Sequence, residues 1–266
     1  MVKILLASRH GGHATRTHLV REVIEDEYKD MEYIVATDYN DDYEYGEKKY
    51  RIDSFRPTNG KFYRPMKALK NLFKSINILI KERPDVVVCY GANTSIILGV
   101  LSTFRSKVIA VESENRTQVP SMSPKILNFF GAEVWTSYDE ILDKYPKDNI
   151  VNKGLIKRRS YEEYRSEEKE GTLVIPSSTD EELMENYWEY RPHQELLEDM
   201  GKTELVVTRA GMTAYEAANL AEKVIVRPYD HIHQKNFAEW LEREYKNVEV
   251  VKDKSFRELF EEYNEK

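Results

Sequence analysis

Short runs of β-branched and other apolar residues alternate along the chain with longer stretches in which apolar residues recur every three or four positions. This alternation is typical of βαβ units, in which parallel strands are connected by helices that cover the sheet. In the first half we expect strands at about 2–8, 32–37, 85–90, 107–112 and 132–136, and helices at about 14–28, 66–83, 94–104, 121–130 and 138–144.

The second half repeats the alternation after a charged interruption. Residues 157–170 carry many charges and no strong apolar period, which is typical of a linker or a solvated helix. Beyond it we expect strands at Thr172–Pro176, Leu205–Thr208, Val224–Arg227 and Val248–Val251, and helices at about 193–200, 212–221, 234–245 and 254–263. The pattern predicts an α/β protein with two Rossmann-like domains: residues 1–152, a charged linker at 153–170, and a shortened second domain at 171–266.

Composition narrows the class of protein. The 266 residues include 40 Lys and Arg against 47 Asp and Glu, and the net charge of −7 argues against general nucleic-acid binding. The single cysteine, Cys89, lies in an apolar run and is expected in the core, so neither a disulfide nor a cysteine-based zinc site is predicted. The longest apolar runs are far shorter than the roughly 20 residues that span a bilayer, and the first residues do not form a signal peptide pattern. We therefore expect a soluble, cytoplasmic protein that can still touch a membrane surface.

The segment 61–83 combines an apolar stripe with concentrated positive charge. Seven of its residues are basic and one is acidic, in a chain that is acidic as a whole. The stripe, at helical spacing, consists of Met66, Leu69, Leu72, Phe73, Ile76, Leu79 and Ile80. Two interpretations fit this pattern: a helix that lies peripherally on an anionic membrane, or a helix whose apolar stripe faces the core and whose outer face is basic.

A glycine turn, Gly11-Gly12-His13, follows the first expected strand and opens a helix. Free backbone N–H groups and the helix dipole make such a turn a ready site for an anion. Neither the dinucleotide fingerprint nor the Walker A sequence is present. His13 at the helix start is a candidate general base, and the alternative is a tight turn with incidental histidines.

Polar residues crowd the end of another expected strand, in Val111-Glu112-Ser113-Glu114-Asn115-Arg116. Two carboxylates, an amide and a guanidinium at one strand end indicate a binding or catalytic site, because the carboxyl ends of parallel strands are where open α/β sheets bind ligands. A solvated loop is the alternative.

The second half contains another strand, glycine turn and helix, from Glu204 through Gly211 to Glu216. The turn offers backbone N–H groups to a phosphate, and Glu216, one turn into the helix, is placed to accept hydrogen bonds from ribose hydroxyls. His231 and His233 lie two residues apart without matching ligands, so no metal site is expected. The acidic stretch 38–42 is expected to be surface loop.

Three second-half stretches together resemble the donor-binding domain of glycosyltransferase family 28, which includes the bacterial lipid II-forming N-acetylglucosaminyltransferase. They are the run 208–217, Val226-Arg227-Pro228, and the run 233–238. The first half resembles the membrane-associated subunit of the eukaryotic two-subunit transferase that adds the second N-acetylglucosamine to dolichol diphosphate. Its matching pieces are Gly11-Gly12-His13, Pro84–Val88 with Gly91, and Val111–Ser113 with Arg116. The chain thus resembles a fusion of the two subunits, acceptor half first.

The resemblance implies an inverting, metal-independent glycosyltransferase of the GT-B type that needs no cofactor besides its donor substrate, UDP-N-acetylglucosamine. The acceptor would be a prenyl-diphosphate-linked sugar at the cytoplasmic, inner face of a membrane. The base would be His13, with Glu112 and Glu114 as rivals. The substrate-binding candidates are Gly11, Gly12, Asn115 and Arg116 in the first half, and Arg209, Ala210, Gly211, Met212, Thr213, Glu216, His233, Gln234 and Asn236 in the second.

The sequence also departs from the family's pattern. The second domain opens on Val174-Ile175-Pro176-Ser177-Ser178-Thr179 where the family has a glycine-rich turn, and it lacks about one βαβ unit. Three alternatives therefore stay open: another UDP-sugar donor such as galactose or glucuronate, a UDP-sugar 2-epimerase, and a non-catalytic scaffold that recruits a separate transferase. The sequence leaves homo-oligomerisation undecided.

Overall fold

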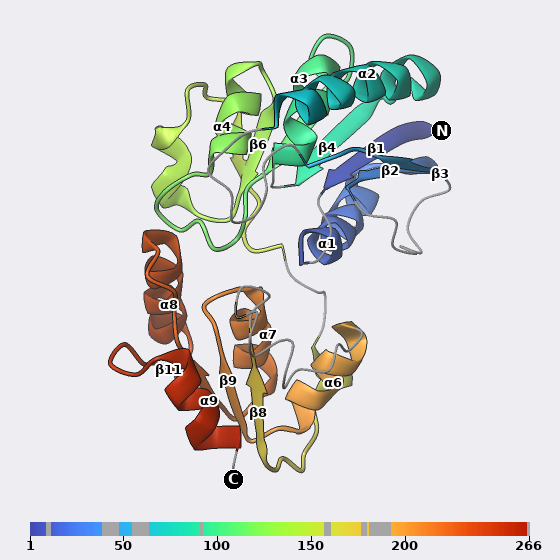
Figure 1. Ribbon diagram of the computed structural model, residues 1–266. Helices are drawn as coiled ribbons and strands as arrows, with labels where there is room; N and C mark the ends of the chain where they lie inside the picture. Colours follow the sequence, from blue (N-terminus) through green and yellow to red (C-terminus); the bar gives the residue numbers. More distant parts are fainter. Residues whose placement is uncertain are drawn as a thin grey trace. The chain divides into compact units, whose positions relative to one another are not determined.

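The computed structural model describes residues 1–8, 12–38, 48–54, 64–90, 93–156, 161–176, 180 and 193–264; within the helices, the side chains of 12–15, 18, 26–27, 193 and 264 are not described. The chain divides into two compact units, Met1–Lys157 and Arg158–Lys266 (Figure 1). Among the described residues, no helix is long and apolar enough to cross a membrane.

The first unit is built on a seven-stranded sheet in the order β3-β2-β1-β4-β5-β6-β7, and every pair of neighbouring strands is parallel. The strands are β1 (Val2–Ser8), β2 (Met31–Thr37), β3 (Lys48–Arg51), β4 (Val86–Tyr90), β5 (Lys107–Val111), β6 (Glu133–Thr136) and β7 (Ile150–Asn152). Helices cover both faces, so the central strands are buried on both sides, as their continuous apolar runs predict.

Alternate residues of β1 enter two different cores. Ile4 and Leu6 pack on the face covered by α1 (Gly12–Glu27), whereas Leu5 and Ala7 face the other core. That second core lies under α2 (Pro65–Glu82), α3 (Ile96–Ser102) and α4 (Met122–Phe129), which follow one another along one side of the sheet in Figure 1. Two 3₁₀ helices, η1 (Asn93–Ser95) and η2 (Asp139–Lys144), complete this unit.

The second unit has a four-stranded parallel sheet in the order β11-β10-β9-β8. Its strands are β8 (Thr172–Ile175), β9 (Leu205–Thr208), β10 (Lys223–Val226) and β11 (Val248–Val250). Its helices are α6 (His193–Lys202), α7 (Met212–Leu220), α8 (Ile232–Glu244) and α9 (Phe256–Asn264), with the 3₁₀ helix η3 at Glu162–Tyr164. The expected α/β class, with a second and smaller parallel sheet, is confirmed.

Two strands were not expected from the sequence. Strand β3 has the sequence KKYR and is largely exposed, and β7 has three residues at the opposite edge of the sheet. Edge strands need no apolar face on both sides, so they lack the signal that identified the central strands. The helix expected at 138–144 is the 3₁₀ helix η2.

The segment expected to be a charged linker, 153–170, is structured in part. Tyr161 and Tyr164 are buried in the second unit, and two backbone hydrogen bonds tie the segment to the end of α6, from Ser166 N to Gly201 O (3.2 Å) and from Glu170 N to Lys202 O (3.0 Å). The many charges of this segment led to the prediction of a linker, and the two buried tyrosines that anchor it were not recognised.

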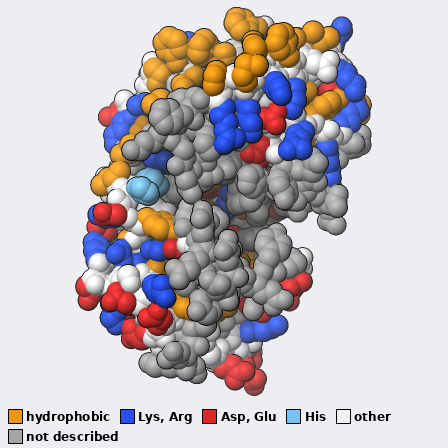
Figure 2. All heavy atoms as spheres, viewed as in Figure 1, with side chains coloured by type: hydrophobic (Ala, Val, Ile, Leu, Met, Phe, Trp, Pro, Cys, Tyr) orange, Lys and Arg blue, Asp and Glu red, His pale blue; other side chains and the backbone are white. Residues whose placement is uncertain are grey.

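Helix α2 lies on the sheet with its polar side inward. Its buried residues are Asn71, Ser75, Ile78 and Glu82. Met66, Phe73 and Ile80 are 66, 65 and 65% exposed, and Leu69 and Ile76 are exposed as well. Figure 2 shows hydrophobic side chains gathered along this side of the first unit. Leu79 still packs against the core, but five of the seven stripe residues are exposed, so the interpretation in which the stripe as a whole faces the core is wrong.

Polar contacts hold α2 in this orientation. Glu82 accepts hydrogen bonds from the hydroxyl of Tyr50 and from Lys48 Nζ (3.1 Å), and these contacts lower the pKa of Glu82. Asn71 Oδ1 accepts from the backbone N–H of Asp53 (2.7 Å), and Lys74 Nζ pairs with the Asp53 carboxylate (2.8 Å). The inner face is thus satisfied by strand β3 and the residues that follow it, and the apolar face is left outward.

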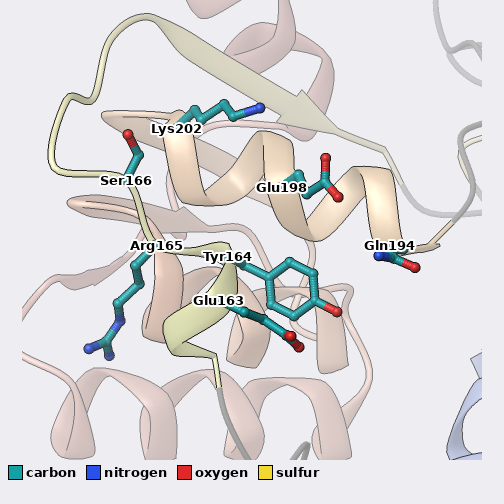
Figure 3. A pocket seen from close by; sticks show the side chains of 7 residues that line it. All are labelled: Glu163, Tyr164, Arg165, Ser166, Gln194, Glu198 and Lys202. Carbon is teal, nitrogen blue, oxygen red and sulfur yellow. The ribbon is translucent and has the colours of Figure 1, made fainter.

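The end of α6 approaches η3 too closely for any side chain at position 201. A Cβ added to Gly201 would lie 1.6 Å from the carbonyl oxygen of Tyr164, in the segment beside α6 in Figure 3. Replacing a helical glycine by alanine usually stabilises a helix by about 1 kcal/mol. Here the clash is with backbone, so we expect Gly201→Ala to lower the free energy of unfolding by about 2 kcal/mol or more, measured by urea denaturation.

The control for this prediction is Gly211→Ala. A Cβ at Gly211 meets no described atom within 4 Å, and the residue has a φ of −145° that alanine also adopts. Because alanine is a poorer N-cap residue than glycine, the unfolding free energy of this variant should fall by up to about 1 kcal/mol, less than the loss expected for Gly201→Ala. A Gly201→Ala protein as stable as wild type would show that η3 and α6 do not meet as described.

Candidate functional site

The strands β1, β4 and β5 are neighbours in the first sheet, and because they are parallel their carboxyl ends share one edge. Most of the residues predicted in the first half follow these ends. Gly11 lies outside the described residues, Gly12 begins α1, and the side chain of His13 is likewise outside them. Their assigned roles remain predictions.

Glu112 is the centre of a hydrogen-bond network at this edge. The side chain is 2% exposed, and its two oxygens accept four hydrogen bonds. The donors are Ser113 N (2.8 Å), Ser121 N (2.7 Å), Ser121 Oγ (2.6 Å) and Tyr145 Oη (2.6 Å). Burial, together with the charge of Glu112, raises the pKa of Tyr145. The carboxylate therefore fixes both ends of the loop 113–121, which carries Asn115 and Arg116.

Glu114 is also buried, at 1% exposure, and accepts a hydrogen bond from Tyr90 Oη (2.5 Å). Burial and the charge of Glu114 raise the pKa of Tyr90 well above its usual value, while the charge of Arg16 opposes this shift. Arg16 is a buried residue of α1 whose Nη1 donates to the carbonyl of Ile156 (3.1 Å). The edge thus holds Arg16, Tyr90 and Glu114 as one buried polar cluster.

The structure brings Glu112, Glu114, Asn115 and Arg116 together, the last two half-buried. Sequence analysis missed four further members of this edge: Arg16, Tyr90, Ser121 and Tyr145. A signal existed for Arg16, which lies one helical turn after His13, and for Tyr90, the polar end of an apolar strand. None existed for Ser121 and Tyr145, whose relation to Glu112 is long-range.

In the second unit, the turn between β9 and α7 leads into a helix start where a Cβ added to Gly211 would meet no described atom within 4 Å. Gly211 is the N-cap of α7, its N–H donates to the carbonyl of Arg209 (2.8 Å), and its own carbonyl accepts from Ala214 N (3.0 Å). The N–H groups of Met212 and Thr213 stand at the helix start, where no preceding helical turn supplies acceptors. With no described atom near a Cβ at Gly211, the turn has room for an anion.

Arg209 does not point freely from this turn. Its guanidinium forms a bidentate ion pair with the carboxylate of Asp180, through Nε (3.2 Å) and Nη2 (2.5 Å). Ala210, the residue between this clamp and Gly211, is fully buried. Asp180 was not among the residues singled out from the sequence.

The remaining predicted residues of the donor half lie on α7 and α8. Strands β9 and β10 are neighbours, so these two helices begin at the same edge of the second sheet. Glu216 is buried on α7, and Gln234 Oε1 accepts from the backbone N–H of Tyr229 (2.9 Å). His233 stacks on His231 with ring centroids 5.7 Å apart, and Asn236 is half-buried on α8. Within the described ranges, no group of three or more His, Cys, Asp or Glu side chains is arranged to hold a metal ion.

A cavity of about 350 Å³ lies between η3 and α6 (Figure 3). Tyr164, Gln194, Glu198 and Lys202 line it, whereas the Arg165 side chain extends away and donates from Nε to the carbonyl of Asn219 (3.2 Å). None of the site residues predicted from the sequence is among the residues that line this cavity.

Solved structures share the fold of this chain. The crystal structure of MurG from Acinetobacter baumannii is 14% identical with a TM-score of 0.61, covering 100% of this chain and 90% of that one. The UDP-GlcNAc 2-epimerase from Methanocaldococcus jannaschii is 14% identical with a TM-score of 0.63, covering 98% and 91%. The expected fold, two Rossmann-like domains of the GT-B type, is confirmed.

The family follows from sequence. Residues 2–155 match the family described as "Oligosaccharide biosynthesis protein Alg14 like", and the chain belongs to this family. A curated relative from Sulfurihydrogenibium sp. (strain YO3AOP1), UDP-N-acetylglucosamine--N-acetylmuramyl-(pentapeptide) pyrophosphoryl-undecaprenol N-acetylglucosamine transferase, is 27% identical over 125 residues. That alignment covers 45% of this chain and 35% of the relative. The resemblance drawn from the sequence motifs is confirmed.

The Glu112 network can be tested with two matched serines. Ser121→Ala removes a hydroxyl that donates to the buried carboxylate, and hydrogen bonds to charged groups contribute about 1.5–3 kcal/mol. We expect a loss of that order in the free energy of unfolding, measured by chemical denaturation. Ser113→Ala is the control, because Ser113 reaches Glu112 through its backbone N–H, which alanine retains. Equal stabilities of the two variants would contradict the network.

Proposed function

We propose that the protein is an inverting, metal-independent glycosyltransferase that moves N-acetylglucosamine from UDP-N-acetylglucosamine to a prenyl-diphosphate-linked sugar at the cytoplasmic face of a membrane. One observation carries the proposal: a chain of the Alg14-like family continues, after residue 157, into a second parallel sheet with an open helix start at Gly211. Acceptor half and donor half are then parts of one chain.

The donor half supplies the electrostatics of the reaction. In the proposed transfer, the acceptor hydroxyl attacks the sugar carbon opposite to UDP, the bond to UDP breaks, and UDP leaves with the bonding electrons. Its developing negative charge is met by the N–H groups of Met212 and Thr213 and by the dipole of α7, without a metal ion. Glu216 holds the ribose, and Gln234 and Asn236 face the donor sugar or its diphosphate.

The acceptor half supplies the base, and we assign this role to His13. The contacts of Glu112 favour His13 over Glu112 as the base, because the Glu112 oxygens already hold the loop 113–121 with four hydrogen bonds. Glu114 is engaged by Tyr90 within the protein. Gly11 and Gly12 would take the acceptor's diphosphate, with Asn115 and Arg116 from the neighbouring loop.

A second candidate function is a UDP-sugar 2-epimerase, because an epimerase of similar fold gives a TM-score as high as that of MurG. The two reactions differ in their need for an acceptor. An epimerase converts a UDP-sugar alone, whereas a transferase consumes one only when the lipid-linked acceptor is present.

We therefore expect product only when a UDP-sugar and a prenyl-diphosphate-linked N-acetylglucosamine are supplied together, with UDP-N-acetylglucosamine favoured over UDP-galactose and UDP-glucuronate. Mass spectrometry of the lipid product measures this.

The Gly211→Ala variant should stay folded but bind UDP about tenfold or more weakly, because a Cβ would occupy the space of the diphosphate. If the wild-type protein converts a UDP-sugar without an acceptor, it is an epimerase. If it binds a UDP-sugar but forms no product, it is a non-catalytic scaffold.

Membrane contact is proposed for the outward face of α2 and its neighbours. Exposed apolar side chains also occur beyond the predicted segment, at Phe104 after α3 and at both ends of α4. Figure 2 shows hydrophobic side chains gathered along this side of the first unit. The exposed apolar residues of these elements are Met66, Leu69, Phe73, Ile76, Ile80, Phe104, Met122, Phe129 and Phe130. Exposed basic residues border them, among them Arg64, Lys70, Lys81, Arg83 and Arg105. Exposed apolar side chains together with exposed basic residues suit the surface of an anionic bilayer.

This face is testable because it does not contribute to the core. Phe73→Asp with Ile80→Asp should leave the melting temperature unchanged and weaken binding to phosphatidylserine-containing vesicles by about 100-fold or more, since each side chain buried in the bilayer contributes about 1.5–3 kcal/mol. Co-sedimentation measures the binding. Ile232→Asp, at an equally exposed position in the second unit, is the control. Undiminished co-sedimentation of the double variant would exclude this face.

A further inference from the structure

The guanidinium of Arg209 is largely enclosed by groups of the second unit. Asp180 takes its Nε and Nη2, and Nη1 points at the carbonyl of Arg227 (3.5 Å). The rings of Tyr229 and Phe256 lie 4.0 and 4.3 Å from the guanidinium carbon. The side chains of Arg209 and Asp180 are only 13 and 10% exposed. This is a desolvated ion pair, in which each charge is expensive to separate from the other.

The partners of Arg209 come from different elements. Asp180 follows β8, Arg209 follows β9, and Arg227 and Tyr229 follow β10, so three adjacent strands are joined just beyond their carboxyl ends. Phe256 adds the start of α9. Tyr229 in turn is held through its backbone N–H by Gln234, in the first turn of α8. One side chain thereby connects the segments that form the proposed donor edge.

The backbone of the same residue closes the turn at Gly211. The carbonyl of Arg209 accepts a hydrogen bond from the N–H of Gly211 (2.8 Å), the residue immediately before the start of α7. Fixing the Arg209 side chain therefore fixes the direction of the N–H groups that follow. A preformed array of N–H groups binds an anion more tightly than one that must be ordered on binding.

We propose that Arg209 is a positioning residue of the donor site and that Asp180 is its obligate partner: the pair orients the Arg209–Thr213 turn toward the donor diphosphate, and the guanidinium does not itself bind phosphate. The proposal rests on the proposed function, in which this turn receives a UDP-sugar. It replaces the role that the sequence suggested for Arg209, direct contact with UDP. A guanidinium whose charge is balanced by a carboxylate at 2.5 Å has little attraction left for a diphosphate.

The two roles make opposite predictions for Asp180. If Arg209 bound phosphate, Asp180→Asn would remove a competing negative charge and tighten UDP binding. If the pair positions the turn, Asp180→Asn weakens UDP binding, and so does Arg209→Gln. Because both substitutions break the same pair, the double variant should lose no more than either single one.

Lysine at position 209 adds a second discrimination. A lysine keeps the positive charge, but its ammonium group cannot form the bidentate pair with Asp180. It also has no planar group to stack against the two aromatic rings. Arg209→Lys should therefore restore UDP affinity if the charge contacts phosphate, and fail to restore it if the planar group positions the turn.

The experiment is calorimetric titration of UDP into the full chain and into Asp180→Asn, Arg209→Gln, Arg209→Lys and the double variant, each well below its melting temperature. We expect each single variant and the double variant to bind about tenfold more weakly than wild type. Arg257→Gln, which removes an arginine paired with Glu261 on the outer side of α9, is the control and should bind as wild type does.

The outcomes separate the two proposals. Wild-type protein that does not bind UDP would overturn the proposed function, and the positioning role with it. Wild-type protein that binds UDP, with an Asp180→Asn variant that binds as tightly or more tightly, would overturn the positioning role alone. A variant that only melts earlier, with unchanged UDP affinity while folded, would reduce the pair to a structural ion pair. Asp180→Asn and Arg209→Lys keep the test decisive if Arg209→Gln does not fold.

Discussion

Parallel strand pairing is the constraint on which the rest of this structure depends. Every strand pair among the described residues is parallel, so each return to the sheet requires a crossover along one of its faces. The helices that make these crossovers bury the faces, and polar residues are left to the loops. All strands of a sheet then release the chain at one edge. Glu112 and Arg209, in separate sheets, both lie at such an edge, where a carboxylate or guanidinium can be surrounded by partners from several loops.

Both edges use a buried charge to order backbone. Glu112 accepts from two backbone N–H groups and two hydroxyls, and Arg209 joins the ends of three strands. In each, the charged side chain is committed to the protein, and the groups left to face a ligand are those it orders. This arrangement suits a site for a phosphorylated substrate, because N–H groups held in place need little reorganisation when charge develops.

The sequence predicted the fold class and the central strands because apolar runs and helical periods are local properties. It could not predict β3 and β7, whose edge positions require no apolar run. It also could not decide which side of α2 faces the sheet. Periodicity shows that a helix has two different faces, but the direction was set by Lys48, Tyr50 and Asp53, contributed by β3 and the residues after it.

The candidate site divides in the same way. Residue types at a strand end identified Glu112, within the stretch 2–155 that matches the family. Arg209 was named only through the motif resemblance of the second half. The roles of both residues depended on Tyr145 and Asp180, each about 30 residues away in sequence. No spacing rule connects such pairs. The local sequence therefore predicts where the site lies, but the role of each residue in it depends on tertiary contacts.

Because α2 turns most of its apolar residues outward, substitutions on its two sides have different consequences. Substitutions at Phe73 or Ile80 do not alter the packing of the core, whereas substitutions at Asn71 or Glu82 break the contacts that dock the helix. Residues on the outward face can therefore be exchanged without a cost in folding. The inner side of this helix is constrained by the fold, whereas its outer side is constrained only by what it meets outside the unit.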